Sequence, residues 1–275
     1  MATLKYTLKS VIKALSLIIA LSILTFTLAQ LSPIDPVRAY VGAESIASPE
    51  QMEYIAQKWG LNDPPLERYG KWATSMLKGD MGDSIVYSRP VIDVIYENVK
   101  NSFWLMFVSW ILSGILGFAL GIVAATYRDK LLDKAIRTFC YILSSTPTFW
   151  IGILLLLIFS VQLKIFPIGL SAPIGKAAAT VTVWDRIYHL ILPALTLSII
   201  GISSIALHTR EKMIEVWNSE YALFARARGE STFAIVKNHG IRNILLPAVT
   251  LQFASISELF GGSVLAENVF SYAGL

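Results

Sequence analysis

Glu258 stands inside an otherwise apolar stretch, Asn243–Ala266. A carboxylate within a membrane span is costly and usually faces a cavity or a partner. At 1.5 Å per residue, Glu258 would lie about 22 Å along a straight helix, toward its outer half. Gln252 and Ser255 fall on roughly neighbouring faces, and Gly262 follows. We therefore expect these four residues to line a path for a cationic or zwitterionic molecule. Alternatively, Glu258 pairs with a neighbouring chain or reaches the surface.

Other reactive side chains are isolated from one another. His189, His208 and His239 are expected at different ends of their spans, and Cys140 is the single cysteine, so no disulfide can form within the chain. The sequence has no G-x-x-x-x-G-K-[ST], H-E-x-x-H or G-x-S-x-G motif, which excludes the familiar nucleotide, zinc and serine-hydrolase sites. We therefore expect no catalytic residue, no metal site and no cofactor in this chain.

Composition indicates a membrane protein, because 55% of the residues are hydrophobic and only 15% are charged. About 20 apolar residues cross a bilayer, and the alternative, a soluble protein with buried helices, would rarely hold helices this long and uniform. The first stretch exceeds the apolar core of a signal peptide, so we expect it to remain as an uncleaved helix. The five expected spans are Ala14–Ile34, Asn101–Tyr127, Thr138–Leu163, Ile187–Thr209 and Asn243–Ala266.

Lysine and arginine predict the orientation, because short basic loops stay on the cytoplasmic side. The basic residues gather before the first span, between spans two and three, and between spans four and five. The N-terminus and residues 210–242 are then cytoplasmic, whereas residues 35–100 and the C-terminus are external. The net charge of +4 follows from this bias and implies no nucleic-acid partner.

The external segment is expected to be a small helical cap. Ser48-Pro-Glu-Gln51 has the form of a capping box and opens a helix that ends near Gly60. A second helix fits Leu66–Lys78, and Gly79–Ser84 is typical of a turn.

Small residues and a proline mark two of the spans. Gly117 and Gly121 form a G-x-x-x-G spacing, which permits close helix approach. It indicates either a pore-lining or subunit-facing seam, or packing within this subunit. Pro147 predicts a kink in span three, which is either near a translocation path or purely structural.

The polar insert, residues 210–242, is predicted to form two short helices. The first contains Tyr221–Ala227 and ends at Gly229, and the second covers about Thr232–Asn238 before span five. A protruding elbow of this kind predicts a docking site for a soluble partner.

The insert resembles that of permease subunits in binding-protein-dependent ABC importers of the nickel and peptide group. The matching stretches are Tyr221-Ala-Leu-Phe-Ala-Arg-Ala-Arg-Gly229 and His239-Gly-Ile-Arg-Asn-Ile-Leu-Leu-Pro247. Leu223-Phe224 depart from the family's Glu-Ala. Similar phrases elsewhere are Gly79-Asp-Met-Gly82, Asn62-Asp-Pro-Pro65, Pro147-Thr-Phe, Leu192-Pro193-Ala and Gly262-Ser-Val-Leu-Ala-Glu267-Asn-Val-Phe270.

The resemblance implies a non-enzymatic pore subunit in the bacterial cytoplasmic membrane, surrounded by lipid. Its expected partners are a homologous second permease, two ATP-binding cassette ATPases that hydrolyse ATP, and an extracytoplasmic substrate-binding protein. The ATPase-coupling residues carried over are Tyr221, Leu223, Phe224, Ala225, Arg226, Ala227, Gly229, His239, Arg242 and Asn243.

The phrase Ser257–Gly262 with Glu267–Phe270 looks closer to nickel permeases, so nickel, chelated or free, is the expected substrate. The alternative is a di- or oligopeptide, and a more distant one is an intramembrane enzyme or a membrane sensor. The family usually has another helix after Tyr272-Ala-Gly-Leu275, so this chain is either shortened or without it.

The expected fold is an all-α polytopic membrane protein with about five transmembrane helices, an external helical cap and a cytoplasmic coupling helix. Three parts are expected: residues 1–34 with the first span, the extracytoplasmic segment 35–100, and the permease core 101–275 with its coupling loop 210–242.

Overall fold

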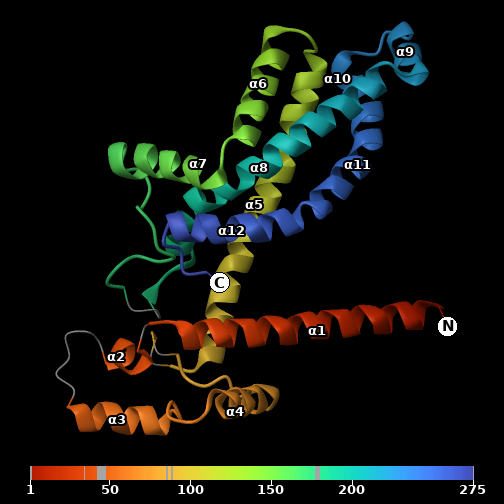
Figure 1. Ribbon diagram of the computed structural model, residues 1–275. Helices are drawn as coiled ribbons and strands as arrows, with labels where there is room; N and C mark the ends of the chain where they lie inside the picture. The colour runs from red at the N-terminus through yellow and green to blue at the C-terminus, as the bar shows by residue number, and fades with distance from the viewer. Residues whose placement is uncertain are drawn as a thin grey trace. The chain divides into compact units, whose positions relative to one another are not determined.

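The computed structural model describes residues 2–33, 35–41, 48–84, 86–87, 89–176 and 180–274, which are predominantly helical (Figure 1). The chain divides into two compact units, Met1–Tyr96 and Glu97–Leu275. Within the described residues, three helices are long and apolar enough to cross a membrane, and the total rises to five if each of two bent helix pairs is one crossing. The prediction of an all-α polytopic membrane protein is confirmed.

The first unit contains a long apolar helix and the short helices of the predicted cap. The Ser48 hydroxyl accepts a hydrogen bond from the Gln51 backbone and the Gln51 side chain accepts one from the Ser48 backbone, so the capping box is confirmed. Tyr69 contacts the long helix through a 2.8 Å hydrogen bond to Ser22. The helices are α1 (Ala2–Leu31), α2 (Pro36–Val41), α3 (Pro49–Lys58) and α4 (Pro65–Leu77).

The second unit is built around one long helix, α8 (Val183–Trp217), which packs against α6, α7, α11 and α12. Most of the apolar part of α8 is buried, so its neighbours cover this helix on several sides. The other elements are α5 (Val91–Thr126), which begins in the first unit, α6 (Leu131–Ser145), α7 (Thr148–Leu155), the π-helical η1 (Leu156–Gln162), α9 (Glu220–Ala227), α10 (Thr232–Ile235), the π-helical η3 (Val236–Gly240), α11 (Ile241–Ala254) and α12 (Ile256–Val269).

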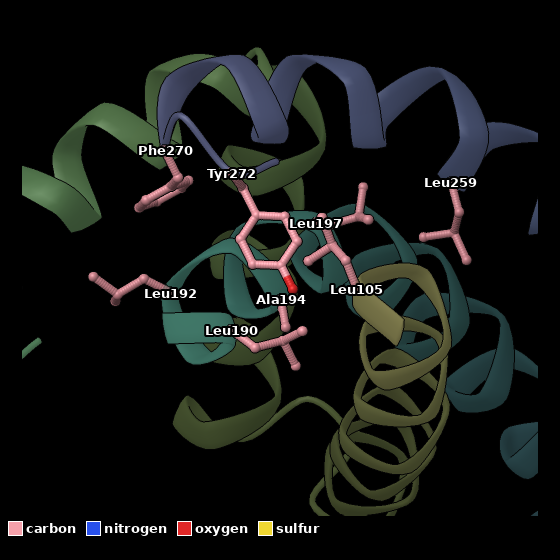
Figure 2. Close-up of a cluster of buried hydrophobic side chains, with 8 residues drawn as sticks. All are labelled: Leu105, Leu190, Leu192, Ala194, Leu197, Leu259, Phe270 and Tyr272. Atoms are coloured by element: carbon pink, nitrogen blue, oxygen red, sulfur yellow. The ribbon is translucent and has the colours of Figure 1, made fainter. Parts of the chain in front are cut away.

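Tyr272 closes the main apolar core of this unit. Figure 2 shows its ring directed into a cluster that α5, α8 and α12 supply. Burial raises the pKa of Tyr272 to about 12, so the ring is held there as a neutral phenol. The tail that carries it is fixed by two hydrogen bonds, from the Leu170 N–H to the Phe270 carbonyl at 2.8 Å and from the Asn101 side chain to the Ala273 carbonyl at 2.7 Å.

The glycine spacing of α5 is used for packing inside the subunit. A Cβ added at Gly117 would come within 2.9 Å of the Ile202 carbonyl, and one at Gly121 within 2.6 Å of the Ala206 carbonyl. Both neighbours belong to α8, so α5 and α8 approach closely at this crossing. Of the two interpretations of the G-x-x-x-G spacing, packing within the subunit is therefore confirmed.

The expected third span is not one kinked helix. The chain bends by 108° between Leu131–Ser145 and Thr148–Gln162 (Figure 1). Thr146 is extended, with φ −100° and ψ 130°, because the following proline disfavours helical backbone at that position. Pro147 then stands just before α7 and starts a new helix instead of bending an old one. The kink predicted at Pro147 is therefore a complete break between two helices.

The expected fifth span is also bent, by 50°, at the residue that separates α11 from α12. That residue, Ser255, donates its hydroxyl hydrogen to the Gln252 carbonyl at 2.8 Å. A backbone carbonyl is thereby occupied by a side chain at the bend. The expected straight helix is therefore interrupted, and Glu258 lies in the first turn beyond the bend. Its depth in the membrane stays a prediction.

Candidate functional site

The polar insert begins as a continuation of α8, which extends to Trp217 instead of ending near Thr209. A short turn then leads to α9, where the Ser219 hydroxyl caps the helix by accepting a hydrogen bond from the Ala222 N–H. Gly229, with φ +83°, ends this helix in a left-handed conformation that suits glycine. In Figure 1, α9 lies at the end of α8 that is remote from α7. The predicted helix, glycine, helix order is confirmed.

One face of α9 is fixed against the rest of the insert. Ala222 and Ala225 are buried together with Ile235 of α10, and Trp217 packs against them. Alanine at both positions lets the two short helices approach closely, because a larger side chain would have no room. Ala225, one of the expected coupling residues, is therefore an internal packing residue.

The opposite face of α9 presents apolar side chains to the surroundings. Leu223 is 65% exposed and Phe224 is 64% exposed, and Tyr221 beside them is also exposed. Phe233 of α10 is 75% exposed. Exposed apolar groups on a short, well-capped helix are typical of a docking surface. We name Tyr221, Leu223, Phe224 and Phe233 the apolar face of the insert.

Phe233 was not among the residues expected to dock. A signal for it does exist in the sequence: Ser231 caps α10, so Phe233 falls in the first helical turn. Ile235, two positions later, takes the inward direction. Residues two apart on a helix face different ways, which leaves the phenylalanine outside.

Arginine side chains brace the insert. The Arg226 guanidinium lies 4.9 Å from the centre of the Trp217 ring and donates to the Trp217 carbonyl. It therefore ties α9 to the end of α8. Arg228 lies 5.9 Å from the centre of the Phe224 ring. Of the other residues expected to couple to the ATPase, Ala227 and Arg242 are exposed.

His239 links the turn after α9 to the start of α11. Its Nε2 lies 3.4 Å from a carboxylate oxygen of Glu230, just after the Gly229 turn. Its carbonyl accepts a 2.7 Å hydrogen bond from the Asn243 side chain, and its ring lies 6.2 Å from the Tyr221 ring. His239 and Asn243 thus hold the return of the chain from α10 into α11.

A buried ion pair lies near the base of the insert and was not anticipated. Arg210 of α8 donates from Nε and Nη2 to the two carboxylate oxygens of Asp133, at 2.6 and 2.7 Å. Asp133 is the first acidic residue of α6 and its side chain is completely buried. The short basic loop before α6 was informative only about orientation, and 77 positions separate the partners, so nothing in the local pattern linked them.

The four residues expected to line a path occupy different environments. Gln252 is buried and donates to the Trp110 carbonyl and to the Ser113 hydroxyl of α5. Gly262 faces α8, because a Cβ there would come within 2.8 Å of Leu197. Glu258 is exposed at the start of α12. The structure therefore brings Gln252 and Gly262 into the interior and leaves Glu258 on the surface of this chain, beside the Ser255 bend.

An apolar groove of about 460 Å³ lies next to the same bend. Its lining is mostly aromatic and aliphatic, and it comes from residues 99–110 of α5 and from α11 and α12. Its aromatic lining residues are Phe103, Phe107, Trp110, Phe253 and Phe260.

Metal-binding clusters are not formed by the part of the chain that the structure describes: no three His, Cys, Asp or Glu side chains gather there. His189 is buried, and its Nδ1 lies 3.0 Å from the Gly169 carbonyl and 3.1 Å from the Leu170 carbonyl. This histidine fixes the loop that precedes α8.

Comparisons with known proteins agree with this architecture. Residues 117–275 match the family described as the binding-protein-dependent transport system inner membrane component, and residues 3–110 match the N-terminal region of such components. The chain belongs to this family. It is thus a multi-pass inner-membrane protein and a permease subunit of a binding-protein-dependent ABC importer.

Individual relatives are similar over nearly the whole chain. An oligopeptide transport system permease protein of Bacillus subtilis is 32% identical over 271 residues, covering 98% of this chain and 84% of the relative. A protein of Brucella abortus named for a peptide transport system permease is 34% identical over 273 residues, with 98% and 83% covered. A glutathione transport system permease protein of Escherichia coli is 33% identical over 272 residues, with 99% and 84% covered. The three relatives are named for oligopeptide, peptide and glutathione transport, and none of these names refers to nickel.

Proposed function

We propose that this chain forms half of a translocation path for short peptides. Its polar insert then faces the cytoplasm and receives one of two ATPase subunits, while a homologous permease supplies the other half of the path. An extracytoplasmic binding protein delivers the peptide on the opposite side. The relatives' names support a peptide substrate in place of nickel.

The observation that carries this proposal is the apolar face of the insert. Its side chains stand out from α9 and α10 while Ala222, Ala225 and Ile235 fix the helices from behind. A rigid helix pair with exposed aromatic and aliphatic groups suits insertion into a groove of a soluble protein. The same rigidity lets a partner move the insert as one body, so that ATP-driven closure shifts α8 and α11.

The ATPase contact is tested with Phe224→Asp, because this exposed position tolerates a charge in the isolated chain. Desolvating that charge in a groove opposes docking, and loss of a central aromatic contact of about 2 kcal/mol weakens binding roughly thirtyfold. Copurification with the ATPases and peptide uptake are measured. The control is Ile174→Asp, a still more exposed apolar position outside the insert. Normal copurification of the Phe224→Asp complex would reject the docking assignment.

Orientation is tested separately in a variant that lacks Cys140, with one cysteine introduced at position 223 or 174. In right-side-out vesicles, an impermeant maleimide should label position 174 and spare position 223. The reverse pattern would place the insert outside and end the proposal.

The substrate is tested with the reconstituted complex and its binding protein. Labelled di- and oligopeptides should accumulate with ATP, and nickel should not. Uptake of nickel but not of peptides would contradict the proposed substrate and favour the nickel transport expected from the sequence.

For the path itself, Glu258 is the residue we propose to contact the substrate. It is exposed on this chain and charged, and a peptide carries a cationic amino terminus. Gln252 and Gly262 would then act indirectly, by setting the position of α11 and α12 relative to α5 and α8.

A further inference from the structure

The Asp133–Arg210 ion pair joins two elements that the sequence does not connect directly. Both carboxylate oxygens of Asp133 are used by Arg210 in a bidentate arrangement. The side chain of Asp133 is completely buried and that of Arg210 is 12% exposed. A second cation, Arg137, lies 3.9 Å from one carboxylate oxygen. The paired groups are therefore held in one geometry, away from solvent.

Asp133 also fixes the short loop between α5 and α6. It accepts a 2.9 Å hydrogen bond from the backbone N–H of Asp129, which has a φ of +64°. Aspartate is one of the few non-glycine residues that adopt this left-handed conformation readily, and the hydrogen bond to Asp133 holds Asp129 in it. The carboxylate thus fastens the loop, the start of α6 and α8 at a single point.

The position of Arg210 along α8 links this point to the insert. Trp217, about two helical turns further on, ends α8 and carries Arg226 of α9 over its ring. A displacement of α9 therefore reaches Arg210 through one continuous helix, and reaches α6 through the ion pair.

A buried ion pair is better suited to transmitting movement between two helices than to stabilising the fold. A buried ion pair adds little stability over well-packed apolar residues of the same volume, whereas separating its partners leaves an uncompensated buried charge. When α8 moves, α6 must therefore move with it, or the ion pair must separate at a high cost in free energy. An apolar contact of the same size would let the two helices slide past each other.

We propose that Asp133 and Arg210 are positioning residues that make α6 and the 127–130 loop move together with α8 when the insert is displaced. This inference rests on the proposed function, because it takes the displacement from ATPase docking. It adds a route by which the movement reaches the broken α6–α7 segment.

The functional test uses the double variant Asp133→Leu and Arg210→Met in the reconstituted complex. Apolar replacement of both partners preserves packing without leaving a buried charge. ATPase copurification and ATP hydrolysis should remain, while the ratio of peptide imported to ATP hydrolysed should fall roughly tenfold, within the range for mutations that weaken coupling. The matched control is Lys212→Met with Glu215→Leu, a more exposed ion pair on the same helix. An unchanged ratio in the Asp133/Arg210 variant overturns the inference.

A second measurement does not depend on the folding of that variant. Spin labels are placed at the exposed Leu131 of α6 and the exposed Glu215 of α8, with Cys140 replaced. Dipolar EPR should give the same narrow distance with and without ATP when the ion pair is intact. A change in that distance on ATP binding would show α6 and α8 moving separately and would refute the inference. Failure of the parent chain to copurify with ATPases would instead refute the proposed function.

Discussion

Trp110 of α5 and Gln252 of α11 bond to each other's backbone: the indole N–H donates to the Gln252 carbonyl at 2.8 Å, and the amide of Gln252 donates to the Trp110 carbonyl. The Gln252 amide also reaches the Ser113 hydroxyl at 3.2 Å. This reciprocal contact fixes α11 against α5 immediately before the Ser255 bend. A glutamine that the sequence suggested for a path is thus part of the framework beside it.

Replacement of Gln252 by leucine should lower the free energy of unfolding by about 1–3 kcal/mol, because the buried hydrogen bonds to α5 are lost. Thermal unfolding of the purified subunit in detergent measures the change. Thr250→Val is the matched control, since that exposed hydroxyl bonds only to a carbonyl of its own helix. Equal unfolding midpoints for the two variants would contradict the framework role.

Two glycine-to-alanine substitutions should change the free energy of unfolding in opposite directions. Gly121→Ala puts a methyl group within 2.6 Å of the Ala206 carbonyl and the Thr209 Cβ, so overpacking should destabilise by about 1–3 kcal/mol. Gly261→Ala on α12 meets no atom within 4 Å and should stabilise by about 0.5–1 kcal/mol through helix propensity. Thermal unfolding of both variants distinguishes packing from propensity. Stabilisation by Gly121→Ala, or no change, would show that the α5–α8 crossing is looser than described.

Gly229→Val should leave membrane insertion normal but abolish ATPase copurification and uptake. A β-branched residue at φ +83° is strained, by about 1–2 kcal/mol or more, so α9 would lose its fixed end. Space is not the cause, because a Cβ there meets no atom within 4 Å.

Gly229→Asn is the informative control for that experiment. Asparagine tolerates the left-handed region better than other non-glycine residues, so this variant should retain most docking. Equal loss in both variants would point to a direct contact of the glycine and not to its backbone conformation.

Glu258→Gln should reduce peptide uptake several-fold without dissociating the complex, because it removes a charge from the proposed path and preserves the side-chain shape. Uptake by reconstituted vesicles and copurification are measured together. Glu258→Asp, which keeps the charge, should be less impaired. Uptake at the parental rate by the Gln variant would rule out a required charge.

The sequence was sufficient for features that depend on local pattern. Apolar length predicted where the long apolar helices and the two bent helix pairs occur, and Ser48 with Gln51 predicted a cap that the structure contains. Gly229 predicted the end of α9 because its left-handed conformation follows from residue type.

The local pattern could not predict the direction in which a helix or side chain points, or contacts between residues far apart in the sequence. A proline is compatible with a kink or with a complete break, and the 108° bend at Pro147 depends on how α6 and α7 pack on α8. Gln252 looked like part of a lining because hydropathy does not say which helix a polar side chain meets. The Asp133–Arg210 pair depends on the tertiary neighbourhood of α6 and α8.

The close crossing of α5 and α8 also limits how this chain can change during evolution. Two relatives are 32% and 34% identical to it, so most aligned positions carry a different residue. At positions 117 and 121, however, the facing helix leaves no volume for even a methyl group. We therefore expect descendants that keep this crossing to retain glycine at both sites, whereas position 261 can change.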